Sequence, residues 1–251
     1  MHEGTNHTLV VIVGLPFEAR LAARISARVI CSGSGRDLSV SLARAITNGC
    51  QGLISLGVAG GLLPNLSAGT CVVGSEILWG TQRLMADPRW SQSLLRVIPG
   101  SISGKIIGVA APIAVPEDKH SLYTRTGAAA VDMESHVVAN AAATNGLPFA
   151  AVRVIADPAE HPLPRAALTA MRPNGTVNIG AMILLLMKHP NELHALAQTA
   201  RNAFAARVML SRICTAFGSC NEPYVRSSPL GGEARIGVET LEIPRACSLG
   251  L

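Results

Sequence analysis

The sequence predicts an α/β protein with a three-layer, phosphorylase/hydrolase-like arrangement: a mixed, mostly parallel central sheet flanked by helices. Short apolar runs recur along the chain and end in glycine or proline, as buried strands do. Segments with helical spacing of apolar residues separate these runs. Aromatic residues make up only 3% of the 251 residues, so the core is built from small and β-branched side chains. Such side chains are typical of closely packed helix-on-sheet proteins.

The first part of the chain alternates strands and helices. Apolar runs predict strands over residues 9–14, 29–31 and 52–57. A short helix over 18–24 follows the first strand. A helix over 37–48 follows the second, with one apolar face and Gly49 as its C-cap. Residues 57–61, Gly-Val-Ala-Gly-Gly, are expected to form a loop after the third strand.

The second part continues the pattern. Strands are expected over 70–78, 106–114, 128–131 and 149–155, with an irregular stretch between the first two. The strand over 128–131 leads into Asp132-Met133-Glu134 and a helix that ends at Asn145-Gly146. Two helices, over 177–188 and 191–216, close a domain of residues 1–217. Residues 218–251 are rich in Gly, Pro and Ser, which predicts a flexible tail.

Charge and cysteine usage restrict the function classes. The 21 basic and 16 acidic residues give a net charge of +5, but the arginines are dispersed. Without a basic tract or an aromatic ladder, nucleic acid is not the expected partner. The charge favours an acidic substrate, a phosphate or an anionic membrane surface, and an ordinary solvated surface explains it equally well. Six cysteines without a CxxC pair predict no zinc ribbon and reduced thiols in the cytoplasm. The acidic and histidine residues do not cluster with ligand spacing, so no metal site is expected.

Two apolar segments bear on membranes. The apolar run near the N-terminus has no basic region before it and no small-residue cleavage site, so we expect a strand and not a signal peptide. Residues 179–187 are too few to cross a bilayer, which takes about 20 residues. That segment fits a buried helix or a peripheral membrane contact.

Two glycine-rich segments are candidates for binding an anion or a sugar through backbone N–H groups. One is 57–61, with Gly57, Ala59 and Gly60. It is neither a P-loop nor a dinucleotide fingerprint, and taken alone it also fits a plain tight turn. The other is Gly33-Ser34-Gly35-Arg36, where a helix N-terminus and a guanidinium both favour an anion.

Carboxylates at strand ends are the candidates for chemistry. Asp132 and Glu134 follow a buried strand at a helix start, where helix capping is the alternative for Asp132. Glu134 is placed to accept hydrogen bonds from two neighbouring sugar hydroxyls, with Met133 against the ring. Asp157 ends a strand that also carries Arg153. It fits either an Asx turn before proline or, with a raised pKa, a general acid.

Four segments together resemble the successive signatures of one family. They are ISLGVAGGL, LSAGTCVVGSEI, AVDMESHVVANAA and PFAAVRVIADP, with matching order and spacing over residues 9–215. The sequence is similar to the purine nucleoside phosphorylase and methylthioadenosine/adenosylhomocysteine nucleosidase superfamily. The early GLPFEAR, the divergent glycine loop and the long apolar C-terminal helices most resemble the hopanoid-associated phosphorylase branch, which removes adenine from adenosylhopane.

The resemblance implies a role for each candidate. Glu134 matches the glutamate that holds the ribose hydroxyls, Met133 the methionine that packs on the sugar, and Asp157 the aspartate that protonates N7 of the departing purine. Arg153 would orient Asp157 or bind the anion. The residues expected to line the site and bind the substrate are Gly33, Gly35, Arg36, Gly57, Ala59, Gly60 and Glu18.

The sequence departs from the family pattern at the nucleophile. Ala19 aligns with the water-activating glutamate of the nucleosidases, and Glu18 stands one place earlier. Val58 replaces the serine that contacts the nucleophile. Arg20 and Arg36 are candidate phosphate ligands in its place, and a plain surface charge explains each equally well. The aromatic residue of the adenine pocket is missing from 111–115. His120 and His136 are expected to be structural.

These observations predict an enzyme, a nucleoside phosphorylase or nucleosidase, that acts on adenosylhopane in hopanoid synthesis with phosphate or water as nucleophile and no cofactor. The alternatives are a methylthioadenosine/adenosylhomocysteine-type nucleosidase and a nucleoside-binding protein without turnover. Retention of both Glu134 and Asp157 argues against binding alone, which needs no proton donor. The family commonly builds oligomers, so a homo-oligomer is expected.

Overall fold

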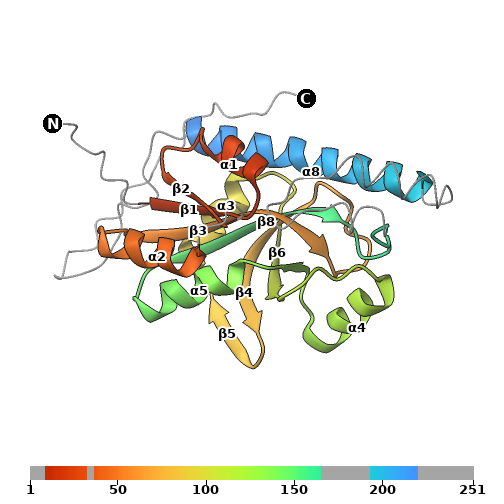
Figure 1. The fold of residues 1–251 in the computed structure, drawn as a ribbon, viewed down its shortest axis with the longest axis horizontal. Helices are drawn as coiled ribbons and strands as arrows, with labels where there is room; N and C mark the ends of the chain where they lie inside the picture. Colours follow the sequence, from red (N-terminus) through yellow and green to blue (C-terminus); the bar gives the residue numbers. More distant parts are fainter. Residues whose placement is uncertain (1–8, 33–36, 165–192, 220–251) are drawn as a thin grey trace.

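The computed structural model describes residues 9–32, 37–164 and 193–219, and in this part helices cover both faces of one eight-stranded sheet (Figure 1). The strands are β1 (Leu9–Val13), β2 (Arg28–Cys31), β3 (Gly52–Gly61), β4 (Cys71–Trp79), β5 (Gln82–Met85), β6 (Ile102–Gly108), β7 (Ala130–Asp132) and β8 (Phe149–Asp157). The helices are α1 (Pro16–Ala22), α2 (Leu38–Thr47), α3 (Pro88–Val97), α4 (Pro116–Thr126), α5 (Ser135–Thr144) and α8 (Leu193–Ser219). The predicted α/β fold class is confirmed.

Part of the sheet closes on itself. β8 lies between β3, to which it is parallel, and β4, to which it is antiparallel. β6 is parallel to both β4 and β7, and β7 returns antiparallel to the end of β3. The strands β3, β8, β4, β6 and β7 therefore form a closed circuit, the strand ring. β1 and β2 extend the sheet from β3, parallel to it, and β5 forms a hairpin with β4.

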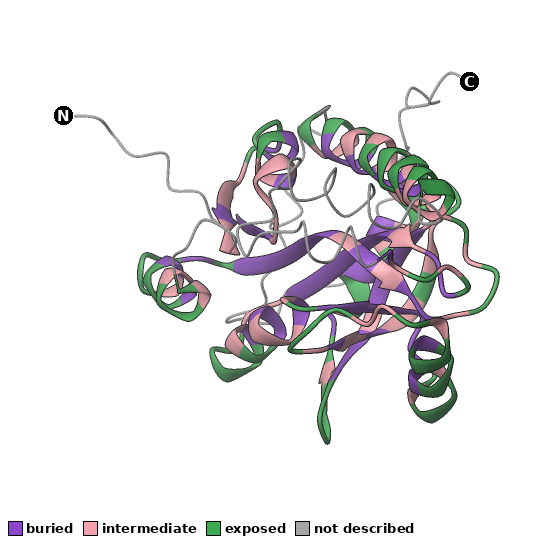
Figure 2. Ribbon diagram, turned by 45° about the vertical axis from the view of Figure 1, so that its right-hand side comes forward, coloured by how far each residue is buried: buried purple, intermediate pink, exposed green. Residues whose placement is uncertain are grey.

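Alternation along the strands builds a core on each face of the sheet. On β1, Val10 and Ile12 point toward α2 and α5, whereas Val11 and Val13 point toward α1, α3 and α8. All four are buried, since β1 has neighbours on both edges and helices on both faces. Figure 2 shows the central strands buried and the outer sides of the helices exposed.

A third, smaller cluster joins α4 to the strand ring. Leu122 of α4 packs with Leu62, which follows β3, and with Val131 of β7. Lys119 lies one turn before Leu122 in α4, and its side chain is fully buried. α4 is thereby held against the end of the ring where β3 and β7 meet.

The structure corrects several predictions. Residues 57–61 are not a loop, because β3 continues through Gly61 and pairs with β8 and then β7. The stretch expected to be irregular contains β5 and α3, and the strand expected over 106–114 is β6, which begins at Ile102 and ends at Gly108. α4 was not predicted. Gly49, the expected C-cap, directly follows the Asn48 cap and has a positive φ of 85°.

The predictions for the C-terminal part of the chain are covered only in part by the described residues. The helix over 177–188 lies outside the described residues, as does the tail from residue 220 onward, and α8 continues to Ser219. No helix in the described part of the chain is long and apolar enough to cross a membrane.

Candidate active site

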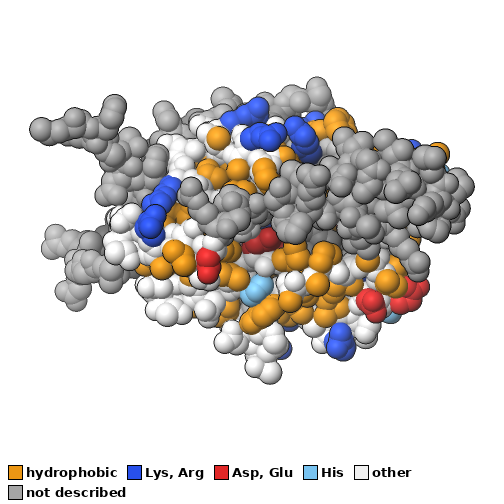
Figure 3. Space-filling model, viewed as in Figure 1, with side chains coloured by type: hydrophobic (Ala, Val, Ile, Leu, Met, Phe, Trp, Pro, Cys, Tyr) orange, Lys and Arg blue, Asp and Glu red, His pale blue; other side chains and the backbone are white. Residues whose placement is uncertain are grey.

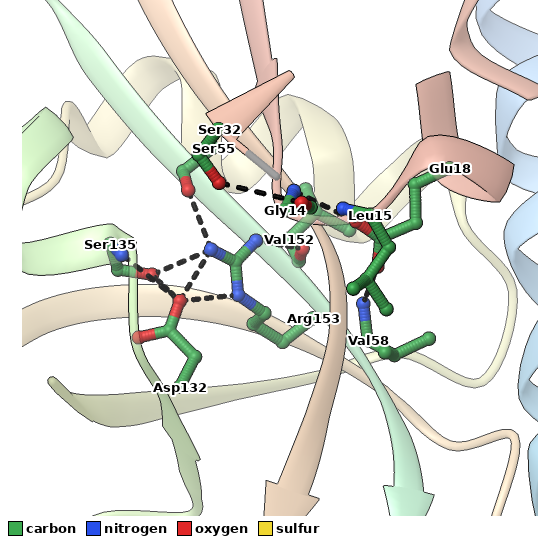
Figure 4. Close-up of polar contacts among 10 residues, drawn as sticks. All are labelled: Gly14, Leu15, Glu18, Ser32, Ser55, Val58, Asp132, Ser135, Val152 and Arg153. Atoms are coloured by element: carbon green, nitrogen blue, oxygen red, sulfur yellow. Dashed lines mark hydrogen bonds and ion pairs between the residues drawn. The ribbon is translucent and has the colours of Figure 1, made fainter. Parts of the chain in front are cut away.

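Glu18 lies in the first turn of α1 with its carboxylate turned inward, and the residue is only 2% exposed. Its Oε2 accepts hydrogen bonds from the backbone N–H groups of Gly14 and Leu15, both at 2.8 Å. Its Oε1 accepts one from the N–H of Val58 on β3, also at 2.8 Å (Figure 4). The bonds to Gly14 and Leu15 cap α1, and the bond to Val58 ties that helix to the middle of the sheet.

Burial is the largest influence on Glu18 and raises the pKa of its carboxyl from 4.5 to about 7. The backbone hydrogen bonds and the charge of Arg153 act in the opposite direction, while the nearby charge of Glu134 raises the pKa further. A carboxyl with a pKa near 7 takes up and releases protons at neutral pH, which is the property of a general base.

Glu134 stands between β7 and α5, at the N-cap position, where its side chain makes no capping hydrogen bond. The carboxylate faces Gly14 instead: a Cβ added to Gly14 would lie 2.9 Å from Glu134 Oε1. Burial raises the pKa of Glu134, and the charge of Arg153 opposes that rise. Met133 beside it is 43% exposed. The site requires glycine at position 14, because two carboxylates approach the chain there.

Arg153 of β8 is the centre of a buried polar network. Its Nε donates to Asp132 Oδ2 at 2.6 Å, and its Nη2 donates to Ser55 Oγ at 2.6 Å and Ser135 Oγ at 3.0 Å (Figure 4). Nη2 and Asp132 Oδ2 also form an ion pair. The network joins β3, β7, β8 and the start of α5, so it fixes the turn that carries Glu134.

The expected contact of Arg153 with Asp157 is not made. The two residues are four positions apart on β8, which is about 13 Å along a strand. The register between β3 and β8 also shifts just before Asp157. Arg153 pairs with Asp132 on β7, and its Nε, Nη1 and Nη2 each donate to partners within the protein.

The charged partner of Asp157 is Lys119 of α4. Lys119 Nζ lies 2.6 Å from Asp157 Oδ2, and the Asp157 side chain remains 16% exposed. Burial raises the pKa of Asp157, whereas the charge and hydrogen bond of Lys119 and the charge of His161 oppose the rise. A carboxyl whose pKa is raised above its usual value keeps its proton to a higher pH, which is a property of a proton donor.

β3 sets the distance between the two ends of the site. Glu18 contacts this strand at Gly57 and Val58, and Asp157 lies beside Gly60. Three residues along a strand span about 10 Å. A ligand that lies along β3 therefore meets Glu18 and Glu134 at one end and Asp157 at the other. Acidic and histidine side chains gather near the middle of the face shown in Figure 3, bordered by hydrophobic side chains.

His136 lies next to this arrangement without a polar role in it. Its ring stacks on Trp79 with the centroids 3.8 Å apart, and it packs so closely on Gly108 that a Cβ there would lie 2.4 Å from Nδ1. Nδ1 is buried without a hydrogen-bond partner in the described residues. Burial lowers the pKa of His136, which favours the neutral ring.

The remaining predicted residues lie in different parts of the molecule. Gly57, Ala59 and Gly60 lie in β3 along the site, whereas Gly33, Gly35 and Arg36 lie outside the described residues. Ala19 packs against the core under α1, so the carboxylate at the nucleophile end comes from Glu18. Arg20 is exposed.

Sequence reasoning missed Lys119, Ser55 and Ser135. A lysine in the polar segment PEDKHSLYTRT resembles any solvated lysine, and no local pattern marks it. Within the described residues, no group of His, Cys, Asp and Glu side chains is arranged to hold a metal ion.

Comparison with known proteins places this geometry in context. The family model described as the phosphorylase superfamily matches residues 8–187. No curated protein sequence matches the chain. Among solved structures, the chain is similar to a 5′-methylthioadenosine/S-adenosylhomocysteine nucleosidase from Colwellia psychrerythraea 34H in complex with adenine. The TM-score is 0.56 at 14% identity, over 83% of this chain and 95% of that chain.

Two further structures have the same fold. An S-adenosylhomocysteine nucleosidase from Streptococcus pyogenes, in complex with 5-methylthiotubericidin, has a TM-score of 0.55 at 17% identity over 84% of this chain and 98% of that chain. The futalosine hydrolase of Helicobacter pylori strain 26695 has a TM-score of 0.52 at 15% identity over 59% of this chain and 87% of that chain. At these identities the likeness concerns the fold.

Proposed function

Because the chain belongs to the phosphorylase superfamily, we propose that it is an enzyme that cleaves the N-glycosidic bond of a purine nucleoside, with water as the nucleophile. The observation that carries the proposal is the placement of two carboxyls with raised pKa, Glu18 and Asp157, at the two ends of a stretch of β3. Glu134 lies at the Glu18 end.

The chemistry of the reaction matches this placement. As the bond between the ribose C1′ and the purine nitrogen breaks, positive charge develops on the ribose and negative charge on the base. Asp157 donates its proton to the departing base, and Glu18 accepts a proton from the water whose oxygen forms the new bond to C1′. Glu134 accepts hydrogen bonds from the ribose hydroxyls and stabilises the positive charge.

The surroundings of Glu18 favour water over phosphate. A carboxylate has about four acceptor sites, and three of those of Glu18 are filled by backbone N–H groups, which leaves one for a water. The same N–H groups form the cradle that would otherwise bind an anion, and the protein's own carboxylate occupies it. Glu134 adds a second negative charge nearby. A phosphate entering here would meet two carboxyl groups, Glu18 and Glu134, and backbone N–H groups that already donate to Glu18.

The test is base release by the purified full-length chain from adenosine-type nucleosides, with and without phosphate, in oxygen-18 water. We expect equal rates in both buffers and a free sugar that carries one oxygen-18 atom at C1′. A requirement for phosphate, with a sugar 1-phosphate as product, would show a phosphorylase. Tight nucleoside binding without turnover by any substrate would favour a nucleoside-binding protein.

Within this activity we propose that the substrate is adenosylhopane, so that the product is adenine and the enzyme serves hopanoid synthesis. The resemblance of GLPFEAR to the hopanoid-associated branch supports this substrate. So does the exposed apolar surface near the site, at Met133 beside Glu134 and at Val115, where the helix of Lys119 begins. Competition between adenosylhopane and methylthioadenosine, measured as the ratio of kcat/KM, tests it. A preference for methylthioadenosine would favour the alternative nucleosidase.

A lipid-linked substrate is reached at a membrane surface. We therefore propose a cytoplasmic enzyme that makes a peripheral membrane contact. Residues 19–31 and 193–219 contain no Asp or Glu, and Figure 3 shows Lys and Arg side chains over α1 and α8. The exposed arginines here are Arg20 of α1, Arg24 shortly after that helix, and Arg201, Arg207 and Arg212 of α8. We expect the chain to sediment with vesicles that contain anionic lipid and not with neutral vesicles. Sedimentation velocity tests the expected homo-oligomer.

A further inference from the structure

Lys119 of α4 is the starting point, because it is a lysine with no exposed surface. Lysine is almost never fully buried unless it has partners. Its ammonium group donates to Asp157 Oδ2 at 2.6 Å, to the carbonyl of Pro158 at 2.9 Å and to the carbonyl of His161 at 3.1 Å. An ammonium has three donors, and all three are used.

All three acceptors lie in one short segment, the end of β8 and the turn after it. Lys119 therefore holds both the backbone of that turn and one oxygen of the Asp157 carboxyl. Because Oδ2 is bound to Lys119, the other oxygen, Oδ1, is the one available to a ligand, and the side chain of Asp157 keeps 16% of its surface exposed. The orientation of the acid thus depends on a residue of a different helix.

The charge of Lys119 matters as much as its position. Burial disfavours the ionised form of a carboxyl, so the carboxylate left after proton transfer is stabilised by a nearby cation. When Asp157 gives up its proton it becomes an anion 2.6 Å from a cation, so the anionic product is stabilised. The other titratable group whose charge acts on Asp157 is His161, in the turn after β8. His161 Nδ1 lies 3.1 Å from the side-chain nitrogen of Asn202 in α8.

We propose that Lys119 is the positioning residue of the proton donor: it presents Oδ1 of Asp157 to the departing base and stabilises the carboxylate that remains after the proton has moved. This inference rests on the proposed function, because it assigns Lys119 a part in the same bond cleavage. It concerns the leaving-group end of the site and is independent of which sugar or tail the substrate carries.

The test compares Lys119→Met, Asp157→Asn and the double variant with the wild-type chain, using kcat and KM for base release between pH 5 and 9. Lys105→Met is the matched control, since Lys105 is a partly exposed lysine that pairs with Glu76 away from the site. Thermal melting of each variant shows whether it is folded. Lys119→Arg keeps a cation at the position.

We expect Lys119→Met to lower kcat by about 10²-fold with little change in KM, as for a misplaced reacting group. The alkaline limb of its pH profile moves to higher pH, because Asp157 loses the cation that favours its ionised form. In the Asp157→Asn background the same substitution has no further effect, and Lys119→Arg recovers part of kcat. Lys105→Met behaves like the wild type.

Different results overturn different statements. A wild-type chain that releases no base overturns the proposed function, and the role of Lys119 falls with it. An active wild type whose kcat and pH profile are unchanged by Lys119→Met overturns the role of Lys119 alone. So does a double variant in which the two losses multiply.

A further measurement needs neither turnover nor a folded Lys119 variant. In the chain labelled with nitrogen-15 lysine, the Nζ signal of buried Lys119 is expected to be protected from exchange. It should shift and lose protection in Asp157→Asn. A signal that is the same in both proteins would show that the ion pair does not form.

Discussion

Glu18→Gln provides a measurable consequence of burying a carboxyl. In the folded chain the pKa of Glu18 is about 7, against 4.5 for the same group in water. Between these two values the folded state keeps the proton while the unfolded state has released it. Folding is therefore favoured most at low pH, and the contribution of Glu18 is lost as the pH rises from 4.5 to 7.

The size of the effect follows from the displacement of the pKa. A displacement of about 2.5 pH units corresponds to about 3 kcal/mol of unfolding free energy, at 1.36 kcal/mol per unit. Glu18 is 2% exposed, so solvent screening does not reduce this figure much. Above pH 7 the contribution is constant. Glutamine does not titrate, so the variant lacks the pH dependence of the unfolding free energy that Glu18 causes. This holds even if the substitution also changes the stability at any one pH.

The assay is urea unfolding of both proteins at intervals from pH 4.5 to 8, and the quantity of interest is the difference between their unfolding free energies. We expect this difference to change by about 3 kcal/mol over the range, with the wild type losing stability relative to the variant as pH rises. Glu117→Gln, at an exposed position of α4, should show no such change. A constant difference for Glu18→Gln would refute a pKa near 7.

Three further outcomes are expected. The rate of base release by the wild type falls about tenfold for each pH unit below 7, because the ionised fraction of Glu18 falls in proportion, and a pH profile of kcat measures it. Glu134→Gln reduces the preference for ribonucleosides over 2′-deoxynucleosides, by about 1.5–3 kcal/mol for a charged hydrogen bond, measured as a ratio of kcat/KM. Arg153→Met destabilises the fold by about 3–5 kcal/mol in urea unfolding, since Asp132 is left as a buried charge without its cation, and adding Asp132→Asn recovers part of the loss.

Much of the fold was predictable because buried strands have a strong local signal. β1 and β8 are apolar runs between helices on both faces, and both were placed within about two residues. The start of α2 was predicted at residue 37, and in the structure Asp37 caps the helix by accepting from Ser39 N–H. These features depend on neighbours in sequence, so the sequence alone reveals them.

What was missed depends on distant neighbours. α4 has a polar sequence in which Lys119 and Leu122 are the buried residues, so no apolar stripe marks it. Residues 57–61 contain three glycines that indicate a turn, yet pairing with β8 and β7 on the two edges keeps them in a strand. Pairing between distant strands overrides local preference at residues 57–61, whereas α4 is recognised only by the few residues that pack against the ring.

The candidate site shows the same division. Glu134 and Asp157 were singled out because carboxylates stand directly after buried strands. The partners of these side chains depend on the arrangement in space. Arg153 of β8 pairs with Asp132 of β7, and Lys119 of α4 pairs with Asp157. The inward turn of Glu18 depends on the N–H of Val58, forty residues away in the sequence. Such pairings are absent from any local pattern.

The closed strand ring also has a consequence for how the chain folds and how it fails. Among the described residues β8 is the last strand in the sequence, yet it lies in the interior between β3 and β4, with Leu53 opposite Phe149. A nascent or truncated chain that ends before β8 leaves the apolar edges of both strands unpaired, which are ready templates for aggregation. Closing so large a loop makes folding slow. Synthesis through β8 is therefore needed to cover these strand edges as well as to bring Glu18, Arg153 and Asp157 together.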